Sequence, residues 1–168
     1  VPMGADLPAA PADRAPRFVV SALRDPGTEA RPGALLSRLQ IVKGWLDREG
    51  RTHERVFDVA GDAKSGADVD LASCEPRGPG ADALCAVWSD PEFDPAERAV
   101  WYARVIENPT CRWTTRVCNA GGVRCDDPSQ PEEGFEPCCD AQVPKTVQER
   151  SWTSPIWYSP VGGGRGAP

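Results

Sequence analysis

The sequence predicts a mainly β protein: a β-sandwich-like domain with long disulfide-bearing loops and little helix. Three observations support this fold class. Short apolar segments alternate with polar residues at a period of two, turn signals separate these segments, and seven cysteines are available for cross-links. The 18 prolines and 16 glycines among 168 residues are typical of a loop-rich fold and show no collagen-like period.

The composition divides the chain into a central domain and two flanking segments. Residues 1–16 are rich in alanine and proline without apolar periodicity, which predicts a linker or an extended lead-in. Residues 17–160 are expected to form a single β-rich domain that includes a cysteine-rich excursion over residues 111–149. The glycine-rich residues 161–168 are expected to form a disordered tail.

The strongest secondary-structure signal is a β-hairpin. A short strand over Phe18–Leu23 comes first, bounded by proline and a turn. The arms 37–46 and 52–60 then flank the glycine-containing turn 47–51, and both arms alternate with period two. Four residues of the first arm share one face: Leu39, Ile41, Lys43 and Trp45.

The second half of the chain contains weaker signals. Residues 61–86 are polar and glycine-rich, which predicts a loop closed by a disulfide. Asp94 has the features of an N-cap before Pro95, which predicts a single helical turn. Residues 98–107 are rich in β-formers and predict a strand, and the aromatic residues 149–158 predict the closing strand of the domain.

The cysteines are expected to form structural disulfides. The candidates are Cys74, Cys85, Cys111, Cys118, Cys125, Cys138 and Cys139. Their spacing lacks the paired ligands and histidines of a zinc site, although metal binding and free thiols stay open as alternatives. Adjacent Cys138 and Cys139 should bond different partners, Cys74 and Cys85 form the preferred pair, and the odd cysteine should remain free or pair outside the chain.

No other group of residues predicts a catalytic or metal site in this chain. His53 lies among charged residues and is expected to be solvated. The acidic residues Asp90, Glu92, Asp94 and Glu97 lack the spacing of a calcium loop, and Ser151 and Ser154 lack a nucleophile motif. Among the tryptophans, core packing is expected for Trp45, Trp101, Trp152 and Trp157, and exposure for Trp88 and Trp113.

Charge and hydropathy restrict the partners and the compartment. The net charge of −6, with both signs interleaved, argues against a nucleic-acid partner. No apolar run approaches the ~20 residues of a membrane span. The cysteines indicate an oxidising compartment, and because the first residues carry no export signal, we expect the start of the natural protein to be missing.

Five motifs occur together and in a fixed order. They are Leu39-Gln-Ile-Val-Lys-Gly-Trp-Leu-Asp47, Thr52-His-Glu-Arg-Val-Phe-Asp-Val-Ala60, Ala86-Val-Trp-Ser-Asp-Pro-Glu-Phe-Asp-Pro95, Trp101-Tyr-Ala-Arg-Val-Ile-Glu107 and Val147-Gln-Glu-Arg-Ser-Trp-Thr-Ser-Pro-Ile-Trp-Tyr158. This series resembles the C-terminal part of a bacterial family of unknown function, DUF3604. The excursion from Cys111 to Cys139 is longer than the connection expected in many relatives.

The resemblance implies a function for a larger protein. Family members resemble exported PHP-type metal-dependent hydrolases, whose N-terminal catalytic part binds divalent metal ions through a His-x-His motif and further ligands. This chain has one histidine and no such motif, so no catalytic, cofactor-binding or metal residue is transferred to it. The expectation is a periplasmic or secreted, non-catalytic module without a cofactor of its own, which packs on the catalytic part of its own full-length protein.

Two other functions remain open from the sequence. The first is a stand-alone extracytoplasmic module that binds carbohydrate or a surface polymer through exposed tryptophans. The second is a redox or metal-storage protein based on the cysteine cluster. A count of free thiols separates this second alternative from the others.

Overall fold

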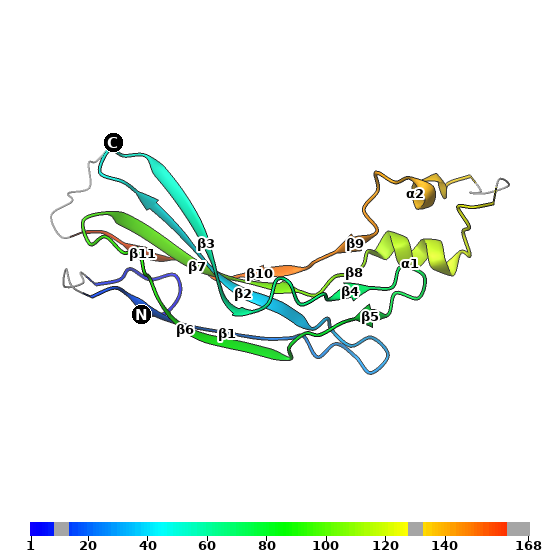
Figure 1. Cartoon of the computed structure of the whole chain (residues 1–168), viewed down its shortest axis with the longest axis horizontal. Helices are drawn as coiled ribbons and strands as arrows, with labels where there is room; N and C mark the ends of the chain where they lie inside the picture. The colour runs from blue at the N-terminus through cyan, green and yellow to red at the C-terminus, as the bar shows by residue number, and fades with distance from the viewer. Residues whose placement is uncertain (9–13, 128–132, 161–168) are drawn as a thin grey trace.

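The computed structural model describes residues 1–8, 14–127 and 133–160, and confirms the mainly β fold (Figure 1). The predicted tail 161–168 lies outside the described residues. The elements are β1 (Arg17–Leu23), β2 (Leu36–Leu46), β3 (Thr52–Gly61), β4 (Asp68–Val69), β5 (Pro76–Arg77), β6 (Ala83–Ser89), β7 (Arg98–Glu107), β8 (Thr110–Cys111), α1 (Trp113–Ala120), α2 (Glu136–Cys139), β9 (Thr146–Val147), β10 (Arg150–Trp152) and β11 (Ile156–Tyr158).

Two antiparallel sheets pack face to face. The large sheet has five strands in the order β10-β7-β2-β3, with β11 also paired to β7. The small sheet contains β1 and β6, which pair without a register shift from Arg17 opposite Ser89 to Leu23 opposite Ala83. The small sheet packs on β2 and β3, so it covers one half of the large sheet.

The predicted hairpin is confirmed by β2 and β3. Leu46 pairs with Thr52 at the turn, and a bulge between Leu39 and Gln40 shifts the register near the other end. β2 is the central strand and is buried over most of its length because β3 and β7 flank it on both sides. The predicted strand over residues 98–107 is also confirmed, as β7.

The closing segment forms two short strands instead of one. β10 and β11 both pair with β7, and Thr153–Pro155 separates them. Pro155 has no backbone N–H and therefore interrupts the ladder. The expectation of core packing is correct for Trp101, but wrong for Trp152 and Trp157, which are 59% and 51% exposed.

β6 was not predicted, because its first residues, Ala83–Ala86, fall at the end of the expected loop 61–86. Its inward residues alternate with apolar outward residues such as Cys85 and Val87, so the period-two signal is weak. The β1 prediction is confirmed, and Phe18 on β1 joins the buried core cluster with Ile41, Ala99, Trp101 and Tyr158.

The remaining elements form a lobe at one end of the molecule, which we call the disulfide lobe (residues 68–77, 110–127 and 133–147) (Figure 1). Its three disulfides are Cys74–Cys111, Cys118–Cys138 and Cys125–Cys139. Adjacent Cys138 and Cys139 thus bond different partners, as predicted. The helix α1 was not expected, because its threonines, valine and tryptophan have low helix propensity.

The predicted Cys74–Cys85 disulfide is wrong. Cys85 lies on the outward face of β6 and is a free, exposed thiol, whereas Cys74 lies in the disulfide lobe against Cys111. The strand β6 carries Cys85 away from the loop that holds Cys74. Cys74 also has a positive φ of 58°, so a local turn directs its side chain towards β8.

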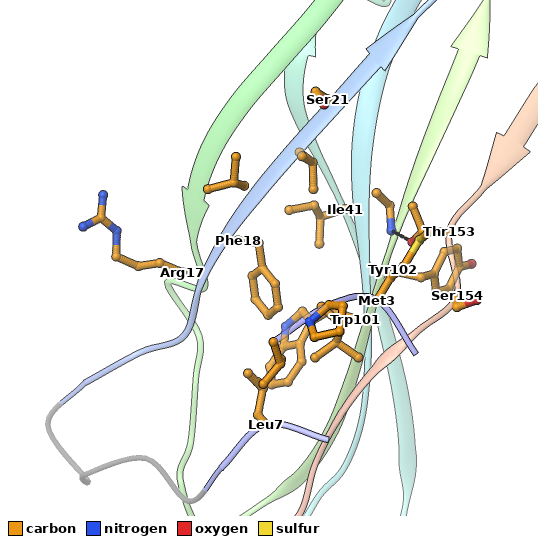
Figure 2. Close-up of a pocket in the computed structure, with 16 residues that line it drawn as sticks. Met3, Leu7, Arg17, Phe18, Ser21, Ile41, Trp101, Tyr102, Thr153 and Ser154 are labelled. Carbon is orange, nitrogen blue, oxygen red and sulfur yellow. Dashed lines mark hydrogen bonds between the residues drawn. The ribbon is translucent and has the colours of Figure 1, made fainter. Parts of the chain in front are cut away.

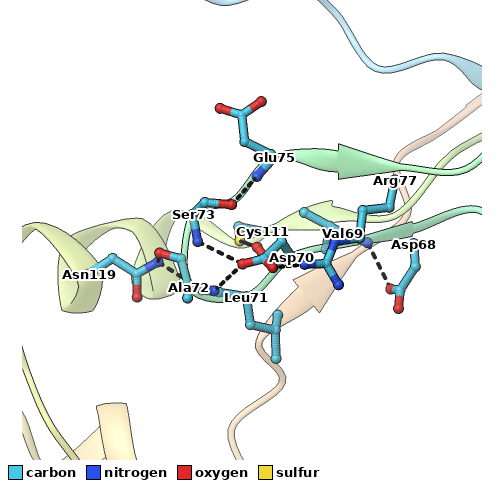
Figure 3. Close-up of polar contacts among 10 residues, drawn as sticks. All are labelled: Asp68, Val69, Asp70, Leu71, Ala72, Ser73, Glu75, Arg77, Cys111 and Asn119. Atoms are coloured by element: carbon cyan, nitrogen blue, oxygen red, sulfur yellow. Dashed lines mark hydrogen bonds and ion pairs between the residues drawn. The ribbon is translucent and has the colours of Figure 1, made fainter.

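Asp70 organises the turn that presents Cys74 (Figure 3). Its carboxylate accepts hydrogen bonds from the backbone N–H groups of Ala72 and Ser73, each at 2.8 Å, and pairs with Arg77. These interactions lower the pKa of Asp70, with the backbone N–H of Ser73 as the main cause. The Asn119 amide of α1 donates to carbonyl oxygens of the same turn and so connects the helix to it.

Candidate functional site

A cleft of about 500 Å³ opens between the two sheets, beside β1 and above β7 and β11. It exists because the small sheet packs on β2 and β3 and leaves the inner face of β7 less covered. Figure 2 shows Phe18 of β1, Ile41 of β2 and Trp101 of β7 gathered between the strands, with Leu7 beside them. The cleft is thus a mainly apolar space bounded by the core.

Trp101 forms the floor of the cleft and is held in place by a buried polar group. Its indole Nε1 donates to Asp90 Oδ2 at 3.1 Å, and only 1% of the residue is exposed. Phe18 and Phe93 contact the indole ring, with centroid distances of 5.2 and 6.2 Å. A buried indole N–H needs such an acceptor, so Asp90 fixes the orientation of the ring.

Asp90 forms an ion pair with Lys43 inside the protein. The Lys43 Nζ lies 2.8 Å from Asp90 Oδ2, and the two side chains are 2% and 0% exposed. Nζ also donates to the backbone carbonyl of Glu92 at 2.6 Å, and Asp90 Oδ1 accepts from the Glu92 N–H at 2.9 Å. Both charges are therefore compensated, as buried charges must be.

The rim of the cleft is formed by the first residues and by the break between β10 and β11. Gly4 N–H donates to Pro155 O at 2.9 Å and Leu7 N–H to Trp157 O at 2.6 Å, so the N-terminal segment runs along β11. Thr153 Oγ1 accepts from the Ala103 N–H at 3.0 Å and closes the gap left in the ladder. The rim therefore places polar groups around an apolar floor.

The outer face of the large sheet is a second candidate surface. Trp152, Arg104, Gln40 and Asp58 lie opposite one another on four strands. Arg104 Nε and Nη2 donate to Gln40 Oε1 at 2.8 and 2.6 Å, and Gln40 Nε2 donates to Asp58 Oδ1 at 2.6 Å. This row combines an exposed indole with side chains held by hydrogen bonds.

Trp157 lies on the same outer face, opposite Val100 of β7. Trp152 lies opposite Arg104, four residues along β7, so the two indoles are separated by roughly 13 Å along the strand direction. Tyr102 is the intervening residue of β7 on this face. The face therefore carries three aromatic residues and one fixed polar row.

The outer face of the small sheet is a third candidate surface. Val19 lies opposite Val87 and Leu23 opposite Ala83, and Val19, Leu23 and Val87 are 74%, 81% and 59% exposed. Cys85, opposite Ser21, lies between these two pairs. We call the surface formed by Val19, Leu23, Ala83, Cys85 and Val87 the small-sheet outer face.

The structure separates the acidic residues that were considered for calcium. Asp90 pairs with Lys43, Glu92 with Arg55, and Asp94 with Arg48 at 3.0 Å. Asp94 Oδ1 also accepts from the Ala96 N–H, which lowers the Asp94 pKa. Residues 94–97 form a hydrogen-bonded turn, and the predicted single helical turn does not form there. Residues 1–8, 14–127 and 133–160 contain no group of three or more His, Cys, Asp and Glu that could hold a metal ion.

His53 and the two tryptophans expected to be exposed differ in how far the structure buries them. His53 Nε2 lies 2.8 Å from Asp47 Oδ2, and this contact, with hydrogen bonds from Arg51, holds the Asp47 pKa well below its usual range. Trp113 is exposed as predicted, but Trp88 is half-buried against Phe57. The sequence did not indicate the three candidate surfaces, because each arises from pairing between distant strands.

The fold defines a class: a β-sandwich module, cross-linked by three disulfides, with an open cleft, an apolar outer face on the small sheet, and an outer face of aromatic and polar residues on the large sheet. The family model "Protein of unknown function (DUF3604)" matches residues 1–160, and the chain belongs to this family. No curated protein and no solved structure matches the chain. In the part of the chain that the structure describes, no helix is long and apolar enough to cross a membrane.

Proposed function

We propose that this chain is the non-catalytic, β-rich C-terminal module of a larger exported PHP-like metal-dependent hydrolase, and that it packs on the catalytic part. The small-sheet outer face is the observation that carries the proposal. An antiparallel sheet with one face in water usually alternates apolar residues inward and polar residues outward. Here Val19, Leu23 and Val87 point outward together, which suits burial against another part of the protein.

The family resemblance supports a catalytic part as the partner in this proposal. It implies a catalytic part that binds divalent metal, and in this proposal the ligands belong to that part. The three disulfides are compatible with a periplasmic or extracellular location, which the proposal adopts. The described chain then contributes support and positioning to the hydrolase.

Alkylation of Cys85 tests the proposal, because this free thiol lies within the small-sheet outer face. Iodoacetamide should label Cys85 rapidly in the 168-residue chain and much more slowly in the longer protein. Glu54→Cys in a Cys85→Ser background is the matched control, because Glu54 lies exposed on the other sheet. Equal labelling of Cys85 in both proteins, with the control unchanged, overturns the docking of this face.

An activity assay tests the division of labour. The 168-residue chain should hydrolyse no phosphodiester and should retain no stoichiometric metal after dialysis. The longer protein should hydrolyse a phosphodiester and should retain stoichiometric metal. Tightly bound metal together with turnover in this chain alone overturns the non-catalytic assignment.

A second candidate function is a stand-alone extracytoplasmic module that binds carbohydrate. The outer face of the large sheet favours it, because Trp152 and Trp157 are exposed beside the fixed row of Arg104, Gln40 and Asp58. Aromatic faces contact the C–H faces of sugars, and fixed polar groups bind their hydroxyls. The redox and storage alternative loses its basis, because six of the seven cysteines are in disulfides.

Tryptophan fluorescence with oligosaccharide ladders separates the two candidates. If the chain is a binding module, Trp152→Ala and Trp157→Ala abolish the change in fluorescence on titration with oligosaccharide. Trp113→Ala, in the disulfide lobe, preserves this change. Absence of any response with the intact chain removes this candidate function and leaves the first proposal unaffected.

A further inference from the structure

The edge of β1 that borders the cleft has unpaired backbone groups. Pro16 and Arg24 flank β1 on either side. Pro16 O accepts from the Asp90 N–H at 3.3 Å, and Arg24 N–H donates to Asp82 O at 2.9 Å, so the backbone groups of Pro16 and Arg24 point towards β6. In an antiparallel ladder, the direction of the backbone groups alternates from residue to residue. The N–H and C=O groups of Arg17, Val19 and Ser21 therefore point away from β6.

That open edge faces the cleft. Within the described residues, β1 has β6 as its only strand partner. Residues 17–21 line the cleft, although the side chains of Val19 and Ser21 point outward, so their backbone forms the wall. Five residues of strand span about 15 Å, which is the length of a short β-strand.

The floor below this edge is suited to a further strand. Trp101 and Ala103 of β7 lie on the inner face of the large sheet, together with Ile156 of β11, and all three line the cleft. Neighbouring strands lie ~4.8 Å apart and stacked sheets ~10 Å apart. A third strand beside β1 would therefore lie over β7, next to Leu7 of the N-terminal segment, which packs on the core cluster there.

β1 also has few of the features that normally protect an edge strand. Such strands usually carry lysine, proline or a bulge that prevents pairing with another chain. Arg17–Leu23 contains no lysine and no proline, its single charged residue is Arg17 at the first position, and its register with β6 is unbroken. The strand is therefore a template for pairing that the intact protein has to cover.

We propose that the cleft receives a β-strand from the catalytic part of the longer protein, which adds to the edge of β1 and completes the sandwich. The inference rests on the proposed function and names how the two parts join. The incoming strand presents alternate apolar side chains to Leu7, Val20 and Ile156, the half-buried apolar residues of the cleft, and its backbone bonds to Arg17, Val19 and Ser21. The outward side chains of the incoming strand lie beside the small-sheet outer face. The same catalytic part can therefore fill the cleft and cover the small-sheet outer face.

Hydrogen exchange measured residue by residue tests strand addition. The amides of Arg17, Val19 and Ser21 should exchange rapidly in the 168-residue chain and slowly in the longer protein, whereas those of Phe18 and Val20 should be protected in both. Protection elsewhere on the module but not at these three amides overturns strand addition and leaves the proposed docking intact. No new protection anywhere overturns both, and concentration-dependent protection in the 168-residue chain assigns the edge to self-association instead.

Proline substitution provides an independent test. Val19→Pro and Ser21→Pro each remove an N–H that faces the cleft and keep the bonds to β6, a position at which edge strands accept proline. Both variants should leave the unfolding midpoint of the 168-residue chain close to that of the wild type, and should lower that of the longer protein. Val19→Ala and Ser21→Ala, which keep the N–H, are the matched controls. An equal effect of proline in the short and long proteins overturns the proposal.

Discussion

The buried Lys43–Asp90 ion pair should be one of the strongest single determinants of stability in this module. Lys43→Met leaves the Asp90 carboxylate buried without its cation, in contact with the Trp101 indole. Removing one partner of a buried pair costs about 3–5 kcal/mol of unfolding free energy. At 2–4 °C per kcal/mol for a domain of this size, the midpoint of thermal unfolding should fall by about 6–20 °C.

A double-mutant cycle with Lys43→Met, Asp90→Asn and the double variant measures the pair directly. Urea unfolding with intact disulfides gives the free energy of unfolding of each variant. The decrease in this free energy for the double variant should be smaller than the sum of the decreases for the two single variants. Arg48→Met is the matched control, because the exposed Arg48–Asp94 pair at 3.0 Å should contribute about 0–1 kcal/mol. A Lys43→Met loss no larger than that of Arg48→Met, or strictly additive losses, refutes the reasoning.

Three further predictions concern the cysteines and the acid response. The Cys74→Ser/Cys111→Ser variant should have an unfolding free energy about 4 kcal/mol lower than that of the wild type, the value of the chain-entropy model for a separation of 37 residues. Urea unfolding measures this difference, and a difference below about 1 kcal/mol contradicts the prediction. Ellman's reagent should detect one thiol per native chain and none in Cys85→Ser, and a second thiol would contradict the disulfide pattern. Because His53 and its neighbours lower the Asp47 pKa, this carboxylate stabilises the fold above about pH 4 and loses that effect as the pH falls towards the lower pKa. Asp47→Asn should therefore unfold with a weaker dependence on pH below 4, and an unchanged acid profile removes Asp47 as a cause.

The sequence predicted those elements whose two faces differ in polarity. The hairpin of β2 and β3 was predicted because its arms alternate, and even Lys43 was placed on the correct inward face. β6 was missed because its outward residues are also apolar. The same property that hid this strand from a periodicity argument makes its outer face a candidate interface.

The features that could not be predicted depend on tertiary contacts. The partner of Cys74 is separated from it by 37 residues and lies on β8, so only the path of the chain could identify it. Trp152 and Trp157 were expected in the core because of their size, but their register against β7 places them on the outer face. The cleft likewise reflects the partial overlap of two sheets, which no local pattern encodes.

The position of the disulfide lobe has a consequence for the motion of the whole molecule in solution. The lobe lies at one end of the long axis, and the two sheets extend towards the other end (Figure 1). A body of this shape rotates faster about its long axis than end over end. Nuclear spin relaxation should therefore differ between amide bonds parallel and perpendicular to that axis, and attachment of a larger partner along the sheets should make the tumbling more uniform.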